Sequence, residues 1–307
     1  MKAAFFAKHG GPEELQFGEY KDPVLGAGQV MVDVHAASVN GADWRVVAGS
    51  YGPVAFFPYS PGRDFSGVVS ALGDGAKDFK VGDEVFGVCD VGTEAAYAEK
   101  VAIKEAIIAK KPAKLTHVES AAVALIGLTA LVSVEDTLQL KKGETILIQG
   151  GAGGVASFAI QIAKHIGARV ITTASAANHA YLKTLGADQI IDYNKEDFTK
   201  VVSNVDAVFD TVGGDVATRS YDVLKAGGRA AFIASGAKAP ATARSDVKGL
   251  RPAVGRDRAH LDRVRALIES GAVKVPEITV YALADAAKAN AVSKGRHFRG
   301  KLVLKVR

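Results

Sequence analysis

The sequence predicts an α/β protein with two domains, one a β-barrel or sandwich and the other a doubly wound parallel sheet. Three observations carry this prediction. Residues 1 to about 115 contain short strand patterns separated by Gly, Pro or Asp. From Glu119 onward, strand and helix patterns alternate, which is typical of a parallel sheet covered on both faces. The length of 307 residues is too great for one small domain and suits two.

The clearest strands of the N-terminal part are QVMVDVHAASV, FSGVVSALG and DEVFGVC. Many short strands with glycine turns favour a barrel or a sandwich. Near the C-terminus, EITVYALADAAKANAVSKG predicts a strand and a helix, and KLVLKV predicts a last strand. We expect this tail to return and complete the first domain, which gives boundaries of 1–115 with 272–307.

The central domain is expected over 116–271, and it opens with a helix over 119–138. After the turn at 141–143, strands and helices alternate. The expected strands are 145–149, 169–173, 189–192, 205–210 and 229–234, and the expected helices are 155–166, 177–185 and 217–224. No internal repeat and no low-complexity segment interrupts this pattern.

Composition narrows the class of protein. Hydrophobic residues make up 48% of the chain and charged residues 23%, which is ordinary for a globular protein. Cys89 is the one cysteine, so a disulfide framework and a multi-cysteine zinc site are excluded within one chain. The N-terminus lacks the apolar region of a signal peptide, and no apolar run reaches about 18 residues. We therefore expect a cytoplasmic protein without a membrane span.

The net charge of +5 has two interpretations, a nucleic-acid surface or a site for an anionic cofactor. The most basic stretch, RPAVGRDRAHLDRVRALIESG, places Leu261, Val264, Leu267 and Ile268 at helical spacing, with the arginines largely on the other face. This pattern predicts an amphipathic surface helix, which favours the cofactor and argues against nucleic acid.

A glycine-rich loop is the strongest functional signal. It follows the strand 145–149 and opens the next helix, and Gly151, Gly153 and Ala156 fit the pattern G-x-G-x-x-A. Such a loop lets backbone N–H groups at a helix N-terminus approach a pyrophosphate closely. We predict a dinucleotide site whose loop contacts are Gly151, Ala152, Gly153, Gly154 and Val155.

The residues after the second strand of this unit predict which dinucleotide binds. NAD sites place Asp or Glu about 20 residues beyond the loop, against the ribose 2′-hydroxyl. Here that position falls among Thr173, Ala174 and Ser175, and the first acid downstream is Asp188. Without a carboxylate to repel a 2′-phosphate, and with donors at Ser175 and Asn178, the loop favours NADP(H). Capping of a helix is an alternative role for both residues.

Five stretches resemble one known family along nearly the whole chain. They are ASVNGADWRVVAGSYG, PGRDFSGVVSALGDGAKDFKVGDEVFG, LIGLTAL, GGAGGVASFAIQIAK, and LGADQIIDY with the terminal RGKLVL. The chain resembles the medium-chain dehydrogenase/reductase superfamily, in its zinc-free quinone oxidoreductase branch. The resemblance implies a GroES-like β-barrel catalytic domain formed by both chain ends, and a central Rossmann domain that binds NADP(H).

The resemblance also bears on metal content. Zinc-dependent members have a cysteine where this chain has Asn40, and a histidine where it has Arg63. Asparagine is a poor zinc ligand and arginine is none. Asp64 stands where those members have a glutamate, and one role for it is to pair with Arg63. We expect no metal.

Roles for single residues follow from the same resemblance. It implies Asn40 and Tyr51 as catalytic residues, with Tyr51 in the substrate pocket, although a turn residue and a rim aromatic are their alternative roles. The further residues implied at the cofactor are Asn40, Thr129, Ala174, Tyr193, Val212, Gly213, Ala234, Ser235, Arg299, Gly300 and Lys301.

The function expected is a zinc-independent, NADPH-dependent reductase that transfers a hydride to quinones or other α,β-unsaturated carbonyl compounds. Without a Lewis acid, an alkoxide is poorly stabilised, so oxidation of simple alcohols is disfavoured. An enoyl-thioester reductase and a non-enzymatic RNA-binding or structural relative are the alternatives. We expect a small-molecule substrate and a homodimer.

Overall fold

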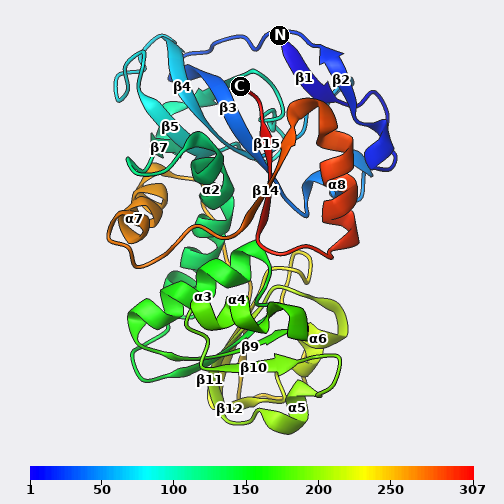
Figure 1. Cartoon of the computed structure of the whole chain (residues 1–307), viewed down its shortest axis with the longest axis vertical. Coiled ribbons are helices and arrows are strands. Elements are labelled where there is room, and N and C mark those ends of the chain that lie inside the picture. Colours follow the sequence, from blue (N-terminus) through cyan, green and yellow to red (C-terminus); the bar gives the residue numbers. More distant parts are fainter. The chain divides into compact units, whose positions relative to one another are not determined.

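The computed structural model describes residues 1–307, and the chain divides into two compact units (Figure 1). The first unit comprises residues 1–125, 256–269 and 275–307, and the second comprises 126–255 and 270–274. The division differs from the sequence-based boundaries mainly at 256–269, which cluster with the first unit. The reason is visible in Arg258, whose guanidinium donates to the backbone oxygens of Ile108 and Glu105 at 3.1 and 2.5 Å.

The first unit contains a seven-stranded sheet and a small two-stranded sheet. The order along the large sheet is β14-β15-β3-β4-β5-β7, and β6 pairs with β3. Its strands are β3 (Gln29–Val39), β4 (Asp64–Leu72), β5 (Glu84–Val88), β6 (Lys100–Lys104), β7 (Ile108–Lys110), β14 (Ile278–Ala282) and β15 (Lys301–Lys305), and the small sheet pairs β1 (Lys2–Phe5) with β2 (Gln16–Glu19).

The C-terminal strand returns to the N-terminal part, as the sequence predicts. Figure 1 shows β15, in red, beside β3, in blue, and the two pair antiparallel from Leu302 opposite Val39 to Lys305 opposite Ala36. Along most of β3, buried and partly exposed residues alternate, which is the period of a strand with one face in the core. Its last residues are buried throughout, so the strand ends inside the unit.

Helices complete the first unit. They are α1 (Asp43–Val47), the start of α2 (His117–Leu131), α7 (Arg258–Glu269) and α8 (Ala286–Gly295), with short 3₁₀ turns at Pro12–Glu14, Glu105–Ile107 and Leu283–Asp285. The amphipathic helix predicted in the basic stretch is α7, in which Leu261 and Val264 are buried. Its arginines make ion pairs instead of a bare basic surface, for example Arg258 with Asp78 and Arg265 with Asp262.

The second unit is a six-stranded parallel sheet in the order β10-β9-β8-β11-β12-β13, the doubly wound sheet that the sequence predicts. The strands are β8 (Thr145–Gln149), β9 (Arg169–Ala174), β10 (Gln189–Asp192), β11 (Val205–Asp210), β12 (Leu224–Phe232) and β13 (Lys248–Leu250). The helices are α3 (Gly154–Ile166), α4 (His179–Thr184), α5 (Phe198–Val201) and α6 (Gly214–Arg219), with a 3₁₀ turn at Ala176–Asn178.

One expected helix of the second unit is shorter than predicted. The sequence predicts a helix over 217–224, but α6 ends at Arg219 and Leu224 already begins β12. Leu224 and Tyr221 are buried in the core between these elements. Their apolar character suited a helix pattern equally well, and the pairing of Leu224 with Val205 decides for the strand.

The helix α2 continues as a π-helical turn over Val132–Thr137. The combined helix, His117–Thr137, has 21 residues, and an 18-residue part of it has a mean hydropathy of 1.7, so its length and composition would suit a membrane span. However, 72% of this 18-residue part is buried inside the protein, as expected for a core helix.

Candidate functional site

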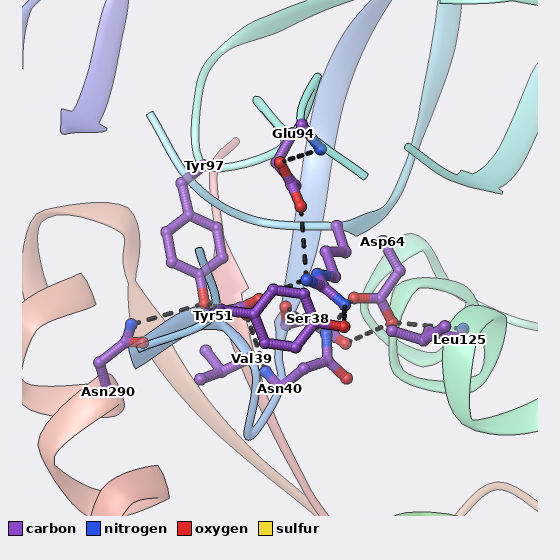
Figure 2. A network of polar contacts seen from close by, with 12 residues as sticks. Ser38, Val39, Asn40, Tyr51, Asp64, Glu94, Tyr97, Leu125 and Asn290 are labelled. Atoms are coloured by element: carbon purple, nitrogen blue, oxygen red, sulfur yellow. Dashed lines mark hydrogen bonds and ion pairs between the residues drawn. The ribbon is translucent and has the colours of Figure 1, made fainter. Parts of the chain in front are cut away.

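A network of buried polar side chains surrounds the end of β3 in the first unit (Figure 2). Asn40 follows β3, and both ends of its amide are bound. The Lys301 ammonium donates to Asn40 Oδ1 at 2.6 Å, and Asn40 Nδ2 donates to Asp64 Oδ1 at 2.6 Å. Asp64 Oδ2 accepts from the Ser38 hydroxyl at 2.6 Å. The Asn40 amide therefore bridges a cation and a carboxylate, and its orientation is fixed.

Arg63 and Tyr51 form the second part of this network. The Arg63 side chain is only 5% exposed, whereas Tyr51 is 47% exposed. The guanidinium lies 4.4 Å from the centre of the Tyr51 ring, and its NH1 donates to the Tyr51 hydroxyl at 3.3 Å. Because the phenol oxygen accepts this bond, its own hydrogen is left to donate to a ligand.

Carboxylates hold Arg63 from its other side. Asp43 Oδ1 lies 4.0 Å from Arg63 Nε, and Glu94 Oε1 lies 3.4 Å from Arg63 NH2. Burial opposes the charge of Arg63, but Asp43, Tyr51 and Glu94 outweigh it, and the pKa of the guanidinium is raised. Asp64, which could have paired with Arg63, binds Asn40 and Ser38 instead.

Burial also changes the acidity of the neighbours. It raises the pKa of Asp43 to about 6, although Arg63, the Asn40 N–H and the Tyr97 hydroxyl stabilise the carboxylate. It lowers the pKa of the Lys301 ammonium, against the attraction of Asp64 and Asp43. The charged forms of Asp43, Arg63 and Lys301 are therefore each stabilised by oppositely charged neighbours and opposed by burial.

The glycine-rich loop of the second unit joins β8 to α3. Gly150 has a φ of +76°, and a Cβ at Gly151 would lie 2.3 Å from Thr172 Oγ1. Both positions therefore need glycine for the fold itself. Gly153, by contrast, has a φ of −74° and its Cβ would meet only the Gly150 oxygen, at 3.4 Å. Here the fold tolerates a side chain, so the bare backbone at the start of α3 suits the approach of a pyrophosphate.

The loop after β11, at Thr211–Gly213, lies beside the glycine-rich loop. The strands β8 and β11 are neighbours at the point where the strand order reverses, and ligands of doubly wound sheets bind outside the carboxyl ends of the strands at such a point. A Cβ at Gly150 would lie 2.9 Å from both Thr211 Oγ1 and Val212 Cγ2, and one at Gly213 would lie 2.7 Å from the Ala234 oxygen. The expected cofactor residues after β8, β11 and β12 are therefore adjacent.

The end of β9 carries the residues expected to select NADP(H). Asn178 Nδ2 donates to Ser175 Oγ at 3.1 Å, so the two side chains support each other. Strand pairing also places an acid here that the sequence did not indicate. Asp192, on β10, lies opposite Ala174 on β9. The Asp192 side chain is only 6% exposed and accepts from the Asn194 N–H and amide. Tyr193, next in the chain, is 59% exposed.

The other predicted cofactor residues are Thr129, Arg299, Gly300 and Lys301, and the contacts described for them are with residues outside these loops. The Thr129 oxygen accepts from the Ser133 hydroxyl within the α2 helix. Arg299 pairs with Glu277, and Gly300 has a φ of +70° close to the Glu277 backbone. Lys301 is only 3% exposed and its ammonium also donates to the Val39 oxygen at 2.6 Å, so its contacts are internal to the first unit. Cofactor contact stays a prediction for these residues.

Comparison with known proteins identifies the family. A model described as the alcohol dehydrogenase GroES-like domain matches residues 26–113, and one described as zinc-binding dehydrogenase matches residues 185–304. A quinone oxidoreductase of Pseudomonas aeruginosa is 32% identical, and the match covers 97% of this chain and 98% of that protein. The chain belongs to the medium-chain dehydrogenase/reductase superfamily. It falls in the quinone oxidoreductase-like branch.

Other relatives of this medium-chain reductase agree. A 2-methylene-furan-3-one reductase of Solanum lycopersicum is 34% identical over 89% of the chain and 70% of that protein. The solved quinone oxidoreductase from Coxiella burnetii is 35% identical, with a TM-score of 0.92 and coverage of 100% and 99%. The Escherichia coli quinone oxidoreductase, solved with NADPH, is 29% identical, with a TM-score of 0.91 and full coverage of both chains. The GroES-like and Rossmann folds expected from the sequence are thereby confirmed.

The superfamily also contains zinc enzymes, whose zinc ligands correspond to Asn40 and Arg63 in this member. A chain described as an NAD-dependent alcohol dehydrogenase is 30% identical, with a TM-score of 0.92 and full coverage. In this member, Asn40 Oδ1 already accepts from an ammonium, and the Arg63 guanidinium has no lone pair to offer. No group of three or more His, Cys, Asp or Glu side chains could hold a metal ion. These donors do not fit zinc.

Proposed function

We propose that this medium-chain reductase is a zinc-independent enzyme that uses NADPH to reduce quinones or other α,β-unsaturated carbonyl compounds. The observation that carries the proposal is the pairing of Tyr51 with Arg63, which presents an exposed phenol whose hydrogen is free to bind a carbonyl oxygen. The relatives described as quinone oxidoreductases and as an NADPH-dependent alkenal/one oxidoreductase of Arabidopsis thaliana support this substrate class.

The reaction follows from this arrangement. NADPH, when bound, supplies a hydride for the β-carbon of the acceptor. The C=C electron pair then forms a double bond to the carbonyl carbon, and the C=O π pair moves to the oxygen, where Tyr51 donates a hydrogen bond and then its proton, or orients a water that does. An enol formed in this way becomes the saturated carbonyl by gaining a proton from water at the α-carbon and losing the one on oxygen. Cys89 is no nucleophile because burial raises the pKa of its thiol to about 12, so direct transfer needs no covalent intermediate. Positioning and stabilisation of the oxyanion then carry most of the rate.

Residues of the second unit would hold the cofactor. The loop from Gly151 to Val155 offers backbone N–H groups to the pyrophosphate, and Val212, Gly213, Ala234 and Ser235 line the adjacent strand ends. Ser175 and Asn178 would bind the 2′-phosphate. NADPH in the solved relatives supports this choice over NADH. The NADPH assignment also requires that Asp192, which is buried and hydrogen-bonded to Asn194, repels the 2′-phosphate only weakly.

An enoyl-thioester reductase is the second candidate. A mycocerosic acid synthase-like polyketide synthase of Mycobacterium tuberculosis contains a segment that is 30% identical over 96% of this chain and spans 15% of that protein.

The homodimer and the cytoplasmic location stay predictions. Light scattering on the purified chain tests the first, and fractionation of the producing cell tests the second.

An acceptor panel tests the function. NADPH consumption is followed by absorbance with 1,2- and 1,4-quinones, alkenals, enones, crotonyl thioesters and simple ketones. We expect turnover with quinones or enones and none with simple ketones. With cofactor deuterated at the transferred position, the label should appear on the β-carbon of the enone product. Turnover confined to thioesters would favour the second candidate, and RNA binding without turnover would contradict both.

A further inference from the structure

We propose that Arg63 is a positioning residue for the reaction, and that it acts through Tyr51. It holds the phenol in place and stabilises the phenolate that remains when the proton has been donated. This inference rests on the proposed function, because it assigns Arg63 a role in the same proton transfer.

The geometry gives Arg63 two separate contacts with one side chain. Its guanidinium faces the Tyr51 ring at 4.4 Å, and NH1 donates to the hydroxyl at 3.3 Å. A cation near the ring face is attracted by the aromatic quadrupole, and a donated hydrogen bond makes the phenol a stronger donor. Arg63 itself is only 5% exposed, so it serves as a fixed support for a residue that is 47% exposed.

The charge of Arg63 is only partly neutralised by its acids. Its Nε and NH2 are buried and make no hydrogen bond, and their nearest carboxylate oxygens lie 4.0 Å away in Asp43 and 3.4 Å away in Glu94. A bidentate carboxylate would have bound both groups at close range. Glu94 is turned partly elsewhere, since it also accepts from the Tyr59 hydroxyl and from the Gly92 N–H. The one hydrogen bond that the guanidinium donates therefore goes to the Tyr51 oxygen.

The acids serve a different purpose, which is to keep a buried cation in the fold. Removal of one partner of a buried ion pair leaves the other charge without compensation. A neutral residue at 63 would leave Asp43 and Glu94 in that condition. Arg63→Lys retains the charge but cannot span the ring and the hydroxyl at once, so it separates the two roles.

A double-mutant cycle tests the coupling. We expect Arg63→Lys to lower kcat at least tenfold in the wild-type background. In the Tyr51→Phe background, the same substitution should lower kcat less than threefold. The dissociation constant for NADPH should change less than twofold in every variant, and melting temperatures report folding. Equal losses in the two backgrounds would overturn the inference while leaving the proposed function intact.

A chemical measurement tests the same coupling without turnover. Tetranitromethane nitrates tyrosine through the phenolate, and peptide mass spectrometry reports the rate at each residue. At fixed pH, we expect nitration of Tyr51 to slow at least threefold in Arg63→Gln or, if that variant does not fold, in Arg63→Lys. Tyr193, exposed in the second unit, is the internal control and should not change. An unchanged or faster rate at Tyr51 would overturn the inference even if the chain reduces no acceptor.

Discussion

Five ionisable side chains lie within the first unit around Asn40 and Tyr51, and each is at most 5% exposed. They are Asp43, Arg63, Asp64, Glu94 and Lys301. Buried charges add little net stability, but loss of one partner costs about 3–5 kcal/mol. Asn40, a neutral residue, makes this arrangement possible because its amide receives a bond from Lys301 and passes one to Asp64.

Tyr51→Phe should separate proton donation from cofactor binding. If the hydroxyl is the acid, we expect kcat to fall by about 10–100-fold, since general acid catalysis contributes that much or more. The dissociation constant for NADPH, measured by fluorescence titration, should stay within twofold of wild type, since Tyr51 lies outside the dinucleotide loops. A kcat equal to that of wild type would identify water as the proton donor.

Ser175→Asp should reverse the cofactor preference. We expect wild type to bind NADPH at least tenfold tighter than NADH, a difference of about 1.4 kcal/mol or more. A carboxylate at position 175 would repel the 2′-phosphate and accept a bond from a ribose hydroxyl. Ser175→Asn is the neutral control and should keep the preference. Equal constants for the two cofactors in wild type, by calorimetry, would contradict the NADPH assignment.

At the scale of elements, the glycines between β8 and α3 have different duties. Gly151 is needed for packing against Thr172 on β9, whereas Gly153 has an ordinary backbone conformation and space beside it. A sequence motif shows both as the same letter. The distinction depends on Thr172, which belongs to the neighbouring strand β9 and contacts only Gly151 of the two.

Two variants should separate these duties. Gly153→Asp should fold with nearly the melting temperature of wild type and lose NADPH binding, because its carboxylate would meet the pyrophosphate. Gly151→Ala should lose about 1–3 kcal/mol of stability even without cofactor, because its Cβ would clash with the Thr172 hydroxyl. Calorimetric melting and NADPH titration of both proteins measure this. A destabilised Gly153→Asp would refute the separation.

A histidine pair links β3 to α2. The rings of His35 and His117 lie with their centres 4.3 Å apart, and His117 Nδ1 is 2.8 Å from the Ser66 hydroxyl. Burial, and then the neighbouring His35, lower the pKa of His117 to about 4, although Glu84 faces its other nitrogen at 3.3 Å. Lys111 adds to the repulsion. The folded state therefore favours a neutral ring.

The sign of the pH effect follows. Between about pH 6.5 and 4 the unfolded chain binds a proton at His117 and the folded chain does not, so stability falls as the pH falls, by about 2–3 kcal/mol in total. His117→Gln should flatten this part of the curve in urea unfolding experiments. Asp43 titrates with the opposite sign over an overlapping range, and its effect cancels between the two proteins. Parallel curves for the two proteins would contradict the assignment.

Much of the arrangement of elements was predictable, because hydrophobic period reports burial directly. The strand at 29–39 and the parallel core strands lie close to where the pattern places them. Side-chain partners were harder. Nothing in the local sequence relates Arg63 to Tyr51, or Lys301 to Asn40, 261 positions away. Asp192 was missed at the β9 end because the count from the glycine loop follows one strand only.

For the whole molecule, the site chemistry predicts independence from metals. Lysine and arginine charges occupy the region where a zinc-dependent relative places electron-pair donors such as thiolate and imidazole. We expect activity to survive 1,10-phenanthroline and EDTA, and elemental analysis to find zinc well below one atom per chain. Inhibition by the chelator that is reversed by added zinc would show that the donor analysis is wrong.

The position of β15 inside the large sheet, between β14 and β3, has a consequence for protein synthesis. Its residues pair with both β3 and β14, and its Lys301 supplies the ammonium that Asn40 needs. On the ribosome, all of the second unit emerges before this strand, so the parallel sheet can form while the first unit still lacks an inner strand. Until Lys301 has been made and β15 has paired, the acids near Asn40 lack one of their cations. We therefore expect the early-made segments of the first unit to stay open to aggregation, and to chaperone binding, for longer than the second unit.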